Sequence, residues 1–395
     1  MVEKPTKQET MAAQAALHAD GSLGFINAPV HRSSTVIFDT ADAYLEREGR
    51  LNGGYFYGLY GTPARYALET EIAKLEGGSG CLAVQSATAA VTVIALHCLK
   101  SGSHVLLPKS AYFATNGVFK AFAGFDVDID VYETSIGAQI ETLIRPETAL
   151  IWLEAPGSFI FDIPKIDAIC EVARKHSVLT CCDATWATPL GISPLNLGCD
   201  FSLHSATKYI GGASEVSLGT LTAKDAKLAE DIRSTAMTFG IGADAESCSA
   251  ILRGLRSLPV RLKHQSEVAL ELACRLEADP RVGRVRHPAL SDHPDHALFQ
   301  SYFTASSGLF SFSVPNVDLS EIRLFASALE LIRLGAGWGG PISLVALNPP
   351  SDLSDDWIIR LSVGFEDIED LWRDLSRALS ALAGASTAKG QADVA

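Results

Sequence analysis

The sequence predicts an α/β protein in which a mostly parallel β-sheet is followed by a smaller α+β domain. In the first part of the chain, short apolar segments alternate with helical patterns, which is typical of a parallel sheet covered by helices on both faces. After about residue 240 the pattern changes to one long helical segment, followed by short strands and helices. The chain has 395 residues, which is long enough for more than one packed unit.

The elements of the first part follow one another in a regular order. Residues 1–55 show little periodic structure and are expected to form an extended arm. A helix is expected over residues 62–78, where glycines end the helical pattern. The segment 164–176 is the clearest helix between two strands, and Pro164 lies near its start. The expected strands are residues 81–84, 104–108, 126–132, 149–153, 178–182, 201–205 and 216–223.

The second part begins with a long helical pattern over residues 245–277, which Pro259 is expected to break or kink. Short strand segments follow at residues 283–288, 308–314, 332–338 and 358–364. The predicted organisation is therefore an arm (1–55), an α/β domain (56–255), an α+β domain (256–383) and a tail (384–395). The tail is small and polar and is expected to be disordered.

Composition excludes several classes of function. The formal net charge is −14, from 32 basic and 46 acidic residues without a basic run, which argues against a nucleic-acid or membrane partner. The most apolar segment, residues 81–99, is interrupted by polar residues and predicts a buried strand and helix. The N-terminus lacks an apolar signal core, and the eight cysteines lack metal-type or redox-type spacing. We therefore expect a soluble, cytoplasmic protein.

The segment "HSATKYIGG", residues 204–212, places Lys208 behind two hydroxyl residues and directly after a predicted strand. Asp183 ends the preceding strand. Ligands gather at the carboxyl ends of parallel strands, so this carboxylate and this amine could share one cleft. The residues alone leave two alternatives open, since Lys208 could be a solvated surface charge and Asp183 could cap a helix.

A phosphate site is also indicated. Ser205 and Thr207 flank the lysine region with hydroxyl groups, and residues 86–91 form a strand-to-helix turn whose N–H groups can bind an anion. A lysine, a carboxylate and a phosphate site are what a pyridoxal phosphate enzyme needs. The lysine holds the aldehyde as a Schiff base, and the carboxylate keeps the pyridine nitrogen protonated. Tyr112, just after the strand 104–108, could stack on the ring or serve only in packing.

Taken together, the motifs resemble the Cys/Met-metabolism pyridoxal phosphate enzymes, which include cystathionine β-lyases, cystathionine γ-synthases and methionine γ-lyases. The resemblance runs through "INAPVHRSSTVIFDT", "YFYGLYGTP", "LEGGSGCLAVQSATAAV", "LEAPGSF", "CDATWATPL", "SATKYIGG" and "IIRLSVGFED". It implies the aspartate-aminotransferase-like fold (fold type I), with cofactor in the domain 56–255. It also implies a homotetramer of two tight dimers, with active sites at the dimer interface and the arm contacting the neighbouring subunit.

The same resemblance implies roles for individual residues. Lys208 is the Schiff-base lysine and proton shuttle, Asp183 pairs with the pyridine nitrogen, and Tyr112 stacks on the cofactor and aids proton transfer. Arg360 clamps the substrate α-carboxylate, and Trp338 and Tyr112 complete the substrate contacts. The implied phosphate contacts are Ser205, Thr207, the backbone of Ala87 and Thr88, and Tyr57 from the neighbouring subunit.

Within this family the sequence favours the β-lyase branch. Trp186 and Trp338 stand where γ-type enzymes usually have Phe and Leu, and residues 252–265 and 303–312 resemble the β-lyases. The expected reaction is cleavage of L-cystathionine, or a related sulfur amino acid, to a thiol such as homocysteine, pyruvate and ammonia, in methionine biosynthesis.

Several alternatives stay open. The chain could be a γ-lyase or a γ-replacement synthase, could racemise amino acids as a side activity, or could bind the cofactor without turnover. Retention of Arg360 argues against pure cofactor storage. His293 and His296 have ligand-like spacing, but a solvated turn is favoured over a metal-dependent hydrolase, and no metal is expected.

The sequence departs from the family pattern at a few positions. Leu59 stands where an arginine generally contacts the phosphate, and Gly337 stands where a serine usually helps to fix the substrate carboxylate. Pro341 and Ile342 replace a commonly acidic position, and Ala213 replaces a common histidine. The sequence therefore does not identify the thiol leaving group.

Overall fold

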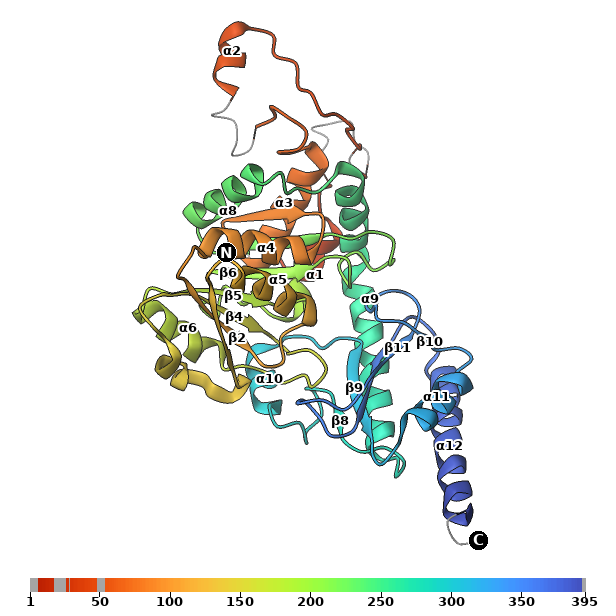
Figure 1. Cartoon of the computed structure of the whole chain (residues 1–395). Helices are drawn as coiled ribbons and strands as arrows, with labels where there is room; N and C mark the ends of the chain where they lie inside the picture. The colour runs from red at the N-terminus through yellow and green to blue at the C-terminus, as the bar shows by residue number, and fades with distance from the viewer. Residues whose placement is uncertain (1–5, 18–25, 28, 48–53, 393–395) are drawn as a thin grey trace, which may run out of the picture. The chain divides into compact units, whose positions relative to one another are not determined.

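The computed structural model describes residues 6–17, 26–27, 29–47 and 54–392, with backbone alone for residues 383–392 (Figure 1). The chain divides into two compact units. The first contains the described residues of Met1–Gly157 together with Ile163–Gly211 and Glu215–Pro259. The second contains Ser158–Asp162, Gly212–Ser214 and the described residues of Val260–Ala395.

The first unit is built around a seven-stranded sheet with the order β1-β7-β6-β5-β4-β2-β3. The strands β2 to β6 are parallel to their neighbours within this set, whereas β7 runs antiparallel to both β1 and β6. The mostly parallel sheet is therefore confirmed, and every strand lies where the sequence predicts one. The strands are β1 (Gly80–Val84), β2 (His104–Pro108), β3 (Asp128–Tyr132), β4 (Thr148–Glu154), β5 (Leu179–Asp183), β6 (Phe201–Ser205) and β7 (Gly219–Ala223).

Helices connect these strands. The helix α3 shows how local sequence sets the ends: the Thr62 hydroxyl caps its start, Pro63 opens its first turn, and Gly77 ends it with a φ of 70°. The helices of this unit are α1 (Gln8–Ala13), α2 (Ala41–Leu45), α3 (Pro63–Glu76), α4 (Ala87–Cys98), α5 (Phe113–Ala123), η2 (Thr134–Leu143), α6 (Ile166–Lys175), α7 (Thr188–Gly191) and α8 (Ala226–Thr238). The long helix α9 (Ala245–Glu277) begins here and continues into the second unit.

One apolar cluster of the first unit lies on the face of the sheet where α4 packs, and Ala83, Ile151 and Cys182 are buried on the opposite face. Leu82, Leu203 and Leu221 project from three neighbouring strands into this cluster, which also contains the contacting rings of Trp152 and Phe119. Because side chains alternate along a strand, Cys181 of this cluster places Asp183 on the same face. The candidate carboxylate therefore faces the layer that contains the start of α4.

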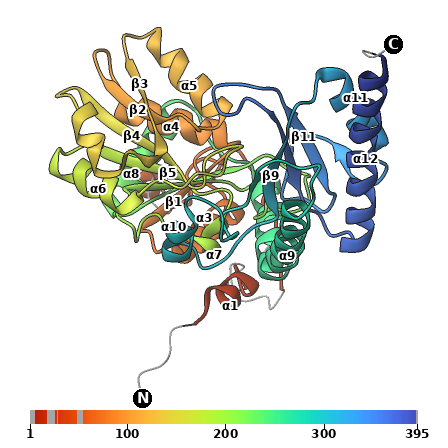
Figure 2. The same cartoon turned by 90° about the horizontal axis from the view of Figure 1, so that it is seen from below.

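The second unit has a five-stranded sheet with the order β10-β11-β12-β9-β8. Its apolar face packs against α11, α12 and the later part of α9, with Phe310, Phe312 and Phe325 at the centre. Figure 2 shows α11 and α12 side by side on this sheet. The elements are β8 (Val285–Arg286), α10 (His296–Tyr302), β9 (Leu309–Val314), α11 (Leu319–Ala328), β10 (Arg333–Leu334), β11 (Leu344–Asn348), β12 (Trp357–Ser362) and α12 (Ile368–Ala392).

Four sequence expectations need correction. The arm contains the helices α1 and α2 rather than only extended chain, and of the break or kink expected at Pro259 the break is wrong, because α9 continues through that residue. The strand β11 was not predicted. The helix α12 reaches Ala392, so residues 384–392 are helical where a disordered tail was expected, and residues 393–395 lie outside the described residues.

Candidate active site

Asp183 stands at the carboxyl end of β5, where Thr185 holds it. Its Oδ1 atom accepts a hydrogen bond from the Thr185 backbone N–H at 2.9 Å and another from the Thr185 hydroxyl at 2.5 Å. The same hydroxyl accepts the N–H of Ser205, at the end of β6, at 2.8 Å. One threonine therefore links the ends of the two strands on which the sequence places the carboxylate and the lysine.

The Asp183 carboxyl is suited to face a cation. Burial is the main influence on its pKa, which it raises above the ordinary value. The Thr185 hydrogen bonds and nearby charges, including that of Lys208, act in the opposite direction without cancelling the effect of burial. A carboxylate that burial destabilises gains more from a cationic partner than an exposed one does, and a protonated ring nitrogen would be such a partner.

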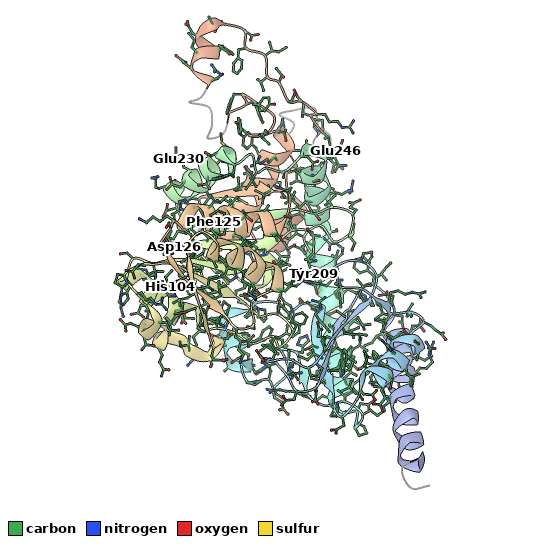
Figure 3. The ribbon with its side chains drawn as sticks, viewed as in Figure 1. His104, Phe125, Asp126, Tyr209, Glu230 and Glu246 are labelled. Carbon is green, nitrogen blue, oxygen red and sulfur yellow. The ribbon has the colours of Figure 1, made fainter. Side chains whose placement is uncertain are left out.

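Lys208 lies in a tight turn directly after β6. Its backbone N–H donates to the Ser205 carbonyl at 3.0 Å, and the Gly211 N–H donates to the Ala206 carbonyl at 2.8 Å. Tyr209, labelled in Figure 3, is fully buried and anchors the turn. The lysine side chain is half-buried. The turn therefore fixes the backbone that carries the amine, at the strand end next to Asp183.

Close packing of α9 on the lysine turn explains the glycines at positions 211 and 254. A Cβ atom at Gly211 would lie 2.8 Å from Cδ1 of Ile251, and one at Gly254 would lie 2.2 Å from the Gly211 carbonyl oxygen. The helix α9, which carries Ile251 and Gly254, thus packs directly on the backbone of the lysine turn. Side chains at these glycines would push the helix away from the turn.

The candidate phosphate site forms where β1 and β6 end. Both Val84 and Ser205 pair with Gly219 of β7. A Cβ atom at Gly219 would lie 2.4 Å from the Ser86 carbonyl oxygen and 2.7 Å from the Ala87 nitrogen. Glycine at position 219 therefore brings Ser205 close to the first turn of α4.

That first turn can donate hydrogen bonds to an anion. The Ser86 hydroxyl caps α4 by accepting the Ala89 N–H at 3.0 Å. The N–H groups of Ala87 and Thr88 precede the first residue that can bond within the helix, so they point out from its start. The structure thus brings Ala87, Thr88 and Ser205 to one end of the sheet, and a phosphate site there stays a prediction.

The Thr207 hydroxyl already takes part in two hydrogen bonds within the protein. It accepts the Leu218 N–H at 2.9 Å and lies 3.3 Å from the Leu218 carbonyl, to which it donates. A hydroxyl has one donor hydrogen, so Thr207 must give up the longer bond in order to donate to a phosphate oxygen.

Tyr112 lies at the start of α5 and is held by a buried carboxylate. Its backbone N–H donates to Oε2 of Glu154 at 2.8 Å, and Glu154 ends β4 in register with Asp183. The Tyr112 ring contacts the ring of Phe113, with centroids 4.5 Å apart, and Phe113 is 68% exposed. Tyr112 is therefore placed at the strand end adjacent to that of Asp183.

Tyr57 and Leu59 lie on the surface of the single chain. Both side chains are about two-fifths exposed, at 43% and 41%. Tyr57 pairs with Thr35 of the arm, and the Gly58 N–H donates to the Ser34 carbonyl at 2.8 Å. Leu59 lines a cavity of about 360 Å³ together with cationic Arg32 and other residues of the arm and of the start of α9. Arg32 forms an ion pair with Glu246 there.

Arg360 and Trp338 belong to the second unit. Arg360 lies on β12, is nearly buried, donates from Nη2 to the Ala336 carbonyl at 2.6 Å, and has its guanidinium 5.6 Å from the ring centre of Phe159. Trp338 follows in the same segment as Ala336 and is half-buried. A Cβ atom at Gly337 would meet only Leu344, at 3.6 Å, so the structure does not require glycine there.

The histidines considered as metal ligands make local bonds. His293 Nδ1 accepts the Asp295 N–H at 3.2 Å, and the two ring nitrogens of His296 contact the Pro288 carbonyl and Gln300. The described part of the chain contains no group of three or more His, Cys, Asp or Glu side chains able to hold a metal ion. Within the same residues, no helix has both the length and the apolarity needed to cross a bilayer.

Thr185, Glu154 and Gly219 also belong to this candidate site, but they are not among the residues that the sequence predicts for it. Thr185 carries a local signal, because an Asp followed two residues later by Thr often closes a turn through its side chain. Glu154 and Gly219 carry no such signal. Glu154 bonds to Tyr112, which is 42 positions away. Position 219 requires glycine because β7 passes close to the start of α4, and this approach is visible only in the structure.

These groups fit pyridoxal phosphate. The first unit offers an amine, a carboxylate that burial destabilises, a pair of helix-start N–H groups with hydroxyls beside them, and an aromatic ring, all at neighbouring strand ends. This donor set matches the aldehyde, ring nitrogen, phosphate and ring face of that cofactor. Fold and donor set together define a pyridoxal phosphate enzyme of fold type I.

The sequence model of the family described as "Cys/Met metabolism PLP-dependent enzyme" matches residues 9–380, and the chain belongs to this family. Its cofactor is accordingly pyridoxal phosphate. The chain is also similar to a solved cystathionine γ-synthase from Xanthomonas oryzae pv. oryzae, with a TM-score of 0.89 and 28% identity over 96% of this chain and 100% of that one. The resemblance and the fold class expected from the sequence are thereby confirmed.

Relatives with known names cover almost the whole chain. A Rhizobium johnstonii protein provisionally named cystathionine β-lyase is 38% identical over 91% of this chain and 92% of its own. The cystathionine β-lyase of Haemophilus influenzae is 34% identical over 92% of this chain and 95% of its own. The L-alanine/L-glutamate racemase of Wolbachia pipientis wMel is 32% identical over 98% of this chain and 100% of its own.

Proposed function

We propose that this protein is a carbon–sulfur β-lyase that cleaves L-cystathionine, or a related sulfur amino acid, to a thiol, pyruvate and ammonia. The observation that carries the proposal is the Thr185 link between the ends of β5 and β6, which places Asp183 beside the Lys208 turn. The β-lyase names of close relatives support this reaction over others of the family. With cystathionine as substrate, the thiol is homocysteine and the pathway is methionine biosynthesis, in the cytoplasm.

The residues would divide the work as follows. Pyridoxal phosphate, when bound, supplies a ring that accepts the electron pair left at the substrate Cα. Lys208 supplies the amine that holds the cofactor and, once the substrate amine has replaced it, the base that takes the Cα proton. Asp183, fixed by Thr185, holds a proton at the ring nitrogen. Ser205, Thr207 and the Ala87 and Thr88 amides bind the phosphate.

The substrate would be oriented by the remaining residues. The Arg360 guanidinium binds the α-carboxylate through two parallel hydrogen bonds, and Trp338 borders the same group. Tyr112 would stack on the cofactor ring and aid proton transfer. The C–S bond then breaks, the thiolate takes a proton, and the three-carbon fragment is hydrolysed to pyruvate and ammonia.

Racemisation is the second candidate activity. It needs only removal of the Cα proton and its return on the other face, and the Wolbachia relative named as a racemase supports it. The γ-synthase name of the structural neighbour keeps γ-elimination and γ-replacement as further outcomes.

One panel of assays separates these activities. Pyruvate release should be measured with cystathionine, cystine, cysteine and djenkolic acid, with 2-oxobutyrate formation and the chirality of alanine and glutamate followed in parallel. Pyruvate as the main product from cystathionine or another of these amino acids supports the β-lyase. Predominant 2-oxobutyrate, or racemised substrate without pyruvate, contradicts it.

The proposal includes a homotetramer built from two tight dimers. Exposed apolar side chains on the described part of the arm support a second chain there, since Ile37 is 89% and Leu45 72% exposed. Tyr57 would then contact the phosphate of the neighbouring subunit.

We expect subunits with Lys208→Ala and subunits with Tyr57→Phe to restore activity when co-assembled, at limiting cofactor. In the mixed dimer, one site has both an intact Lys208 and an intact Tyr57 from the partner chain. Activity of the mixture should exceed the sum of the two separate variants. A fully active monomer in sedimentation at low concentration, or no gain on mixing, contradicts the assembly.

We expect Leu59→Arg to tighten cofactor binding about ten- to a hundredfold. A charge-assisted hydrogen bond to the phosphate is worth roughly 1.5–3 kcal/mol, and about 1.4 kcal/mol corresponds to one decade in affinity. The measurement is the cofactor dissociation constant of the apoenzyme, with Leu59→Met as the neutral control. Substrate choice should stay the same, because position 59 would face the phosphate.

Arg32 lines the same cavity as Leu59, so it is the first candidate for the phosphate cation if Leu59→Arg does not tighten cofactor binding. Unchanged affinity in Leu59→Arg together with weaker binding in Arg32→Gln means that Arg32 already supplies the missing cation. Unchanged affinity with a shifted substrate profile means that Leu59 belongs to the substrate pocket.

A further inference from the structure

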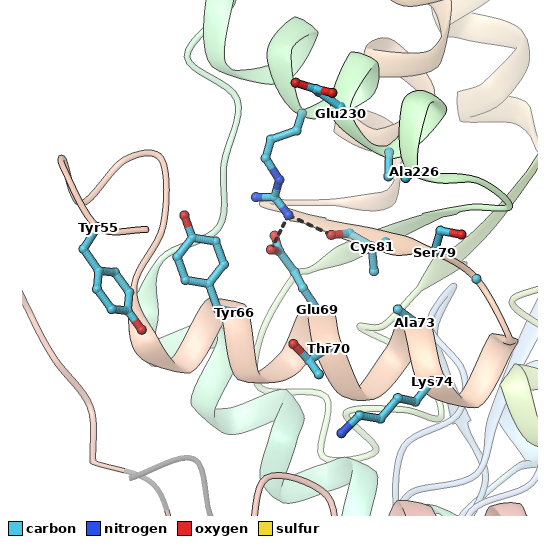
Figure 4. Close-up of a pocket in the computed structure, with 14 residues that line it drawn as sticks. Tyr55, Tyr66, Glu69, Thr70, Ala73, Lys74, Ser79, Cys81, Ala226 and Glu230 are labelled. Carbon is cyan, nitrogen blue, oxygen red and sulfur yellow. Dashed lines mark hydrogen bonds and ion pairs between the residues drawn. The ribbon is translucent and has the colours of Figure 1, made fainter. Parts of the chain in front are cut away.

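A buried group of three charged side chains ties α3 to the sheet and to α8. Glu69 is 3% exposed, and its Oε1 accepts hydrogen bonds from Arg65 Nε and from the Ala83 N–H, both at 2.8 Å. Its Oε2 accepts Arg233 Nη2 at 2.6 Å, and the same nitrogen donates to the Cys81 carbonyl at 3.0 Å. Figure 4 shows Glu69 and Cys81 with these two bonds, at a cavity of about 650 Å³.

Arg65 extends this group to the segment that carries Tyr57. Only 1% of Arg65 is exposed, and its Nη1 donates to the Leu59 carbonyl at 3.0 Å. The next residue of α3, Tyr66, donates from its hydroxyl to the Gly54 carbonyl at 3.0 Å. Two consecutive helix residues therefore bind both ends of the segment 54–59, with Tyr57 between them.

The fit around the Arg65–Leu59 bond is close. A Cβ atom at Gly242 would lie 2.8 Å from Arg65 Nη1 and 2.9 Å from the Leu59 carbonyl oxygen. Tyr57 itself pairs with Thr35 of the arm and contacts Tyr60, whose N–H donates to the Tyr57 carbonyl at 3.0 Å and whose ring centre lies 5.8 Å from that of Tyr57. The Tyr57 side chain is 43% exposed. Among the described contacts of Leu59, the bond from Arg65 is the one that reaches into the buried interior.

We propose that Arg65 is a positioning residue for Tyr57. Its guanidinium, fixed by Glu69, holds the Leu59 carbonyl and so sets the direction in which the Tyr57 hydroxyl projects toward the cofactor phosphate of a second copy of the chain. Only arginine can do this, because its planar fork directs Nε to Glu69 and Nη1 to Leu59 at once, whereas a lysine serves one acceptor at that reach. The inference rests on the proposed function, which assigns the phosphate contact to Tyr57.

A double-mutant cycle tests the inference. The dissociation constant for pyridoxal phosphate is measured by titrating the apoenzyme and following its fluorescence, for wild type, Arg65→Lys, Tyr57→Phe and the double variant. We expect Tyr57→Phe and Arg65→Lys each to weaken binding about three- to tenfold, and the double variant to bind no more weakly than Tyr57→Phe alone. Arg233→Lys is the matched control, because it disturbs the other oxygen of Glu69 without touching Leu59.

Each outcome decides the question. If Arg65→Lys and Tyr57→Phe weaken cofactor binding independently, so that their effects multiply in the double variant, the inference is wrong. It is also wrong if Arg233→Lys weakens binding as much as Arg65→Lys does. Either result leaves the role of Tyr57 intact. No effect from Tyr57→Phe removes both the phosphate role of Tyr57 and the inference, without affecting the chemistry assigned to Lys208. If Arg65→Lys does not fold, Gly242→Ala replaces it, since the added methyl group crowds the Arg65–Leu59 bond while keeping both residues.

Discussion

Lys208→Ala should abolish pyruvate release, with a loss of several orders of magnitude in kcat. The substitution removes both the amine that holds the cofactor and the base that takes the Cα proton, and no second amine lies in the turn from Ser205 to Gly211. The variant should still bind pyridoxal phosphate through the phosphate site and Asp183. The measurements are kcat for pyruvate release and the amount of cofactor retained after gel filtration.

Two controls keep this prediction specific. Lys109→Ala removes an amine that forms an exposed ion pair with Glu133, and it should leave kcat unchanged. A free amine added to Lys208→Ala should restore part of the activity, because it can act as the missing base. Substantial activity in the variant without added amine would mean that another residue takes the Cα proton.

Asp183→Asn should lower kcat by about a hundred- to four-thousandfold. Removing one partner of a buried charge pair costs about 3–5 kcal/mol, and about 1.4 kcal/mol corresponds to one decade in rate. Asparagine still accepts the Thr185 hydrogen bonds, so the strand end should keep its geometry while the ring nitrogen loses its counter-charge. Nitrogen-15 NMR of labelled cofactor gives the direct readout, as the ring nitrogen should lose its proton in the variant.

Asp183→Asn should make the cofactor-free protein more stable, although it lowers the activity of the protein with cofactor bound. Burial raises the pKa of Asp183, so the folded apoprotein binds more protons than the unfolded chain between the ordinary pKa and the raised one. The free energy of unfolding contributed by this group therefore falls as pH rises through that window. Asp183→Asn should remove this loss and make the apoprotein more stable at neutral pH, as measured by urea unfolding between pH 4 and pH 8. A less stable variant apoprotein would show that the carboxylate is already paired without cofactor.

Much of the fold could be predicted from the sequence because the central strands are short, apolar and separated by helices. The long helix α9 was harder. Pro259 removes one backbone donor, but Leu255, Leu258 and Leu262 are buried along the same helix, and this packing keeps it continuous. The strand β11 shows little alternation in its sequence and is defined by its pairing with β10 and β12.

The candidate site also contains some residues that could be predicted from the sequence and others that could not. Lys208, Asp183 and the start of α4 could be predicted because each lies at or just after the end of a strand and carries a residue type with evident chemistry. Glu154 could not, because the residue that it bonds, Tyr112, is 42 positions away, and the bond between Thr185 and Ser205 likewise appears only in the fold. Spacing along the chain predicts which groups react, whereas the structure shows which residues bond to the segments that carry them.

The most direct test of the central claim is to locate the cofactor attachment chemically. The purified protein, saturated with pyridoxal phosphate, should absorb visible light, and the band should vanish on treatment with borohydride. Peptide mapping of the reduced protein should then place the cofactor mass on Lys208, in the peptide that contains "SATKYIGG". A label on another lysine, or no visible band in cofactor-saturated protein, would contradict the assignment of Lys208 and the reaction built on it.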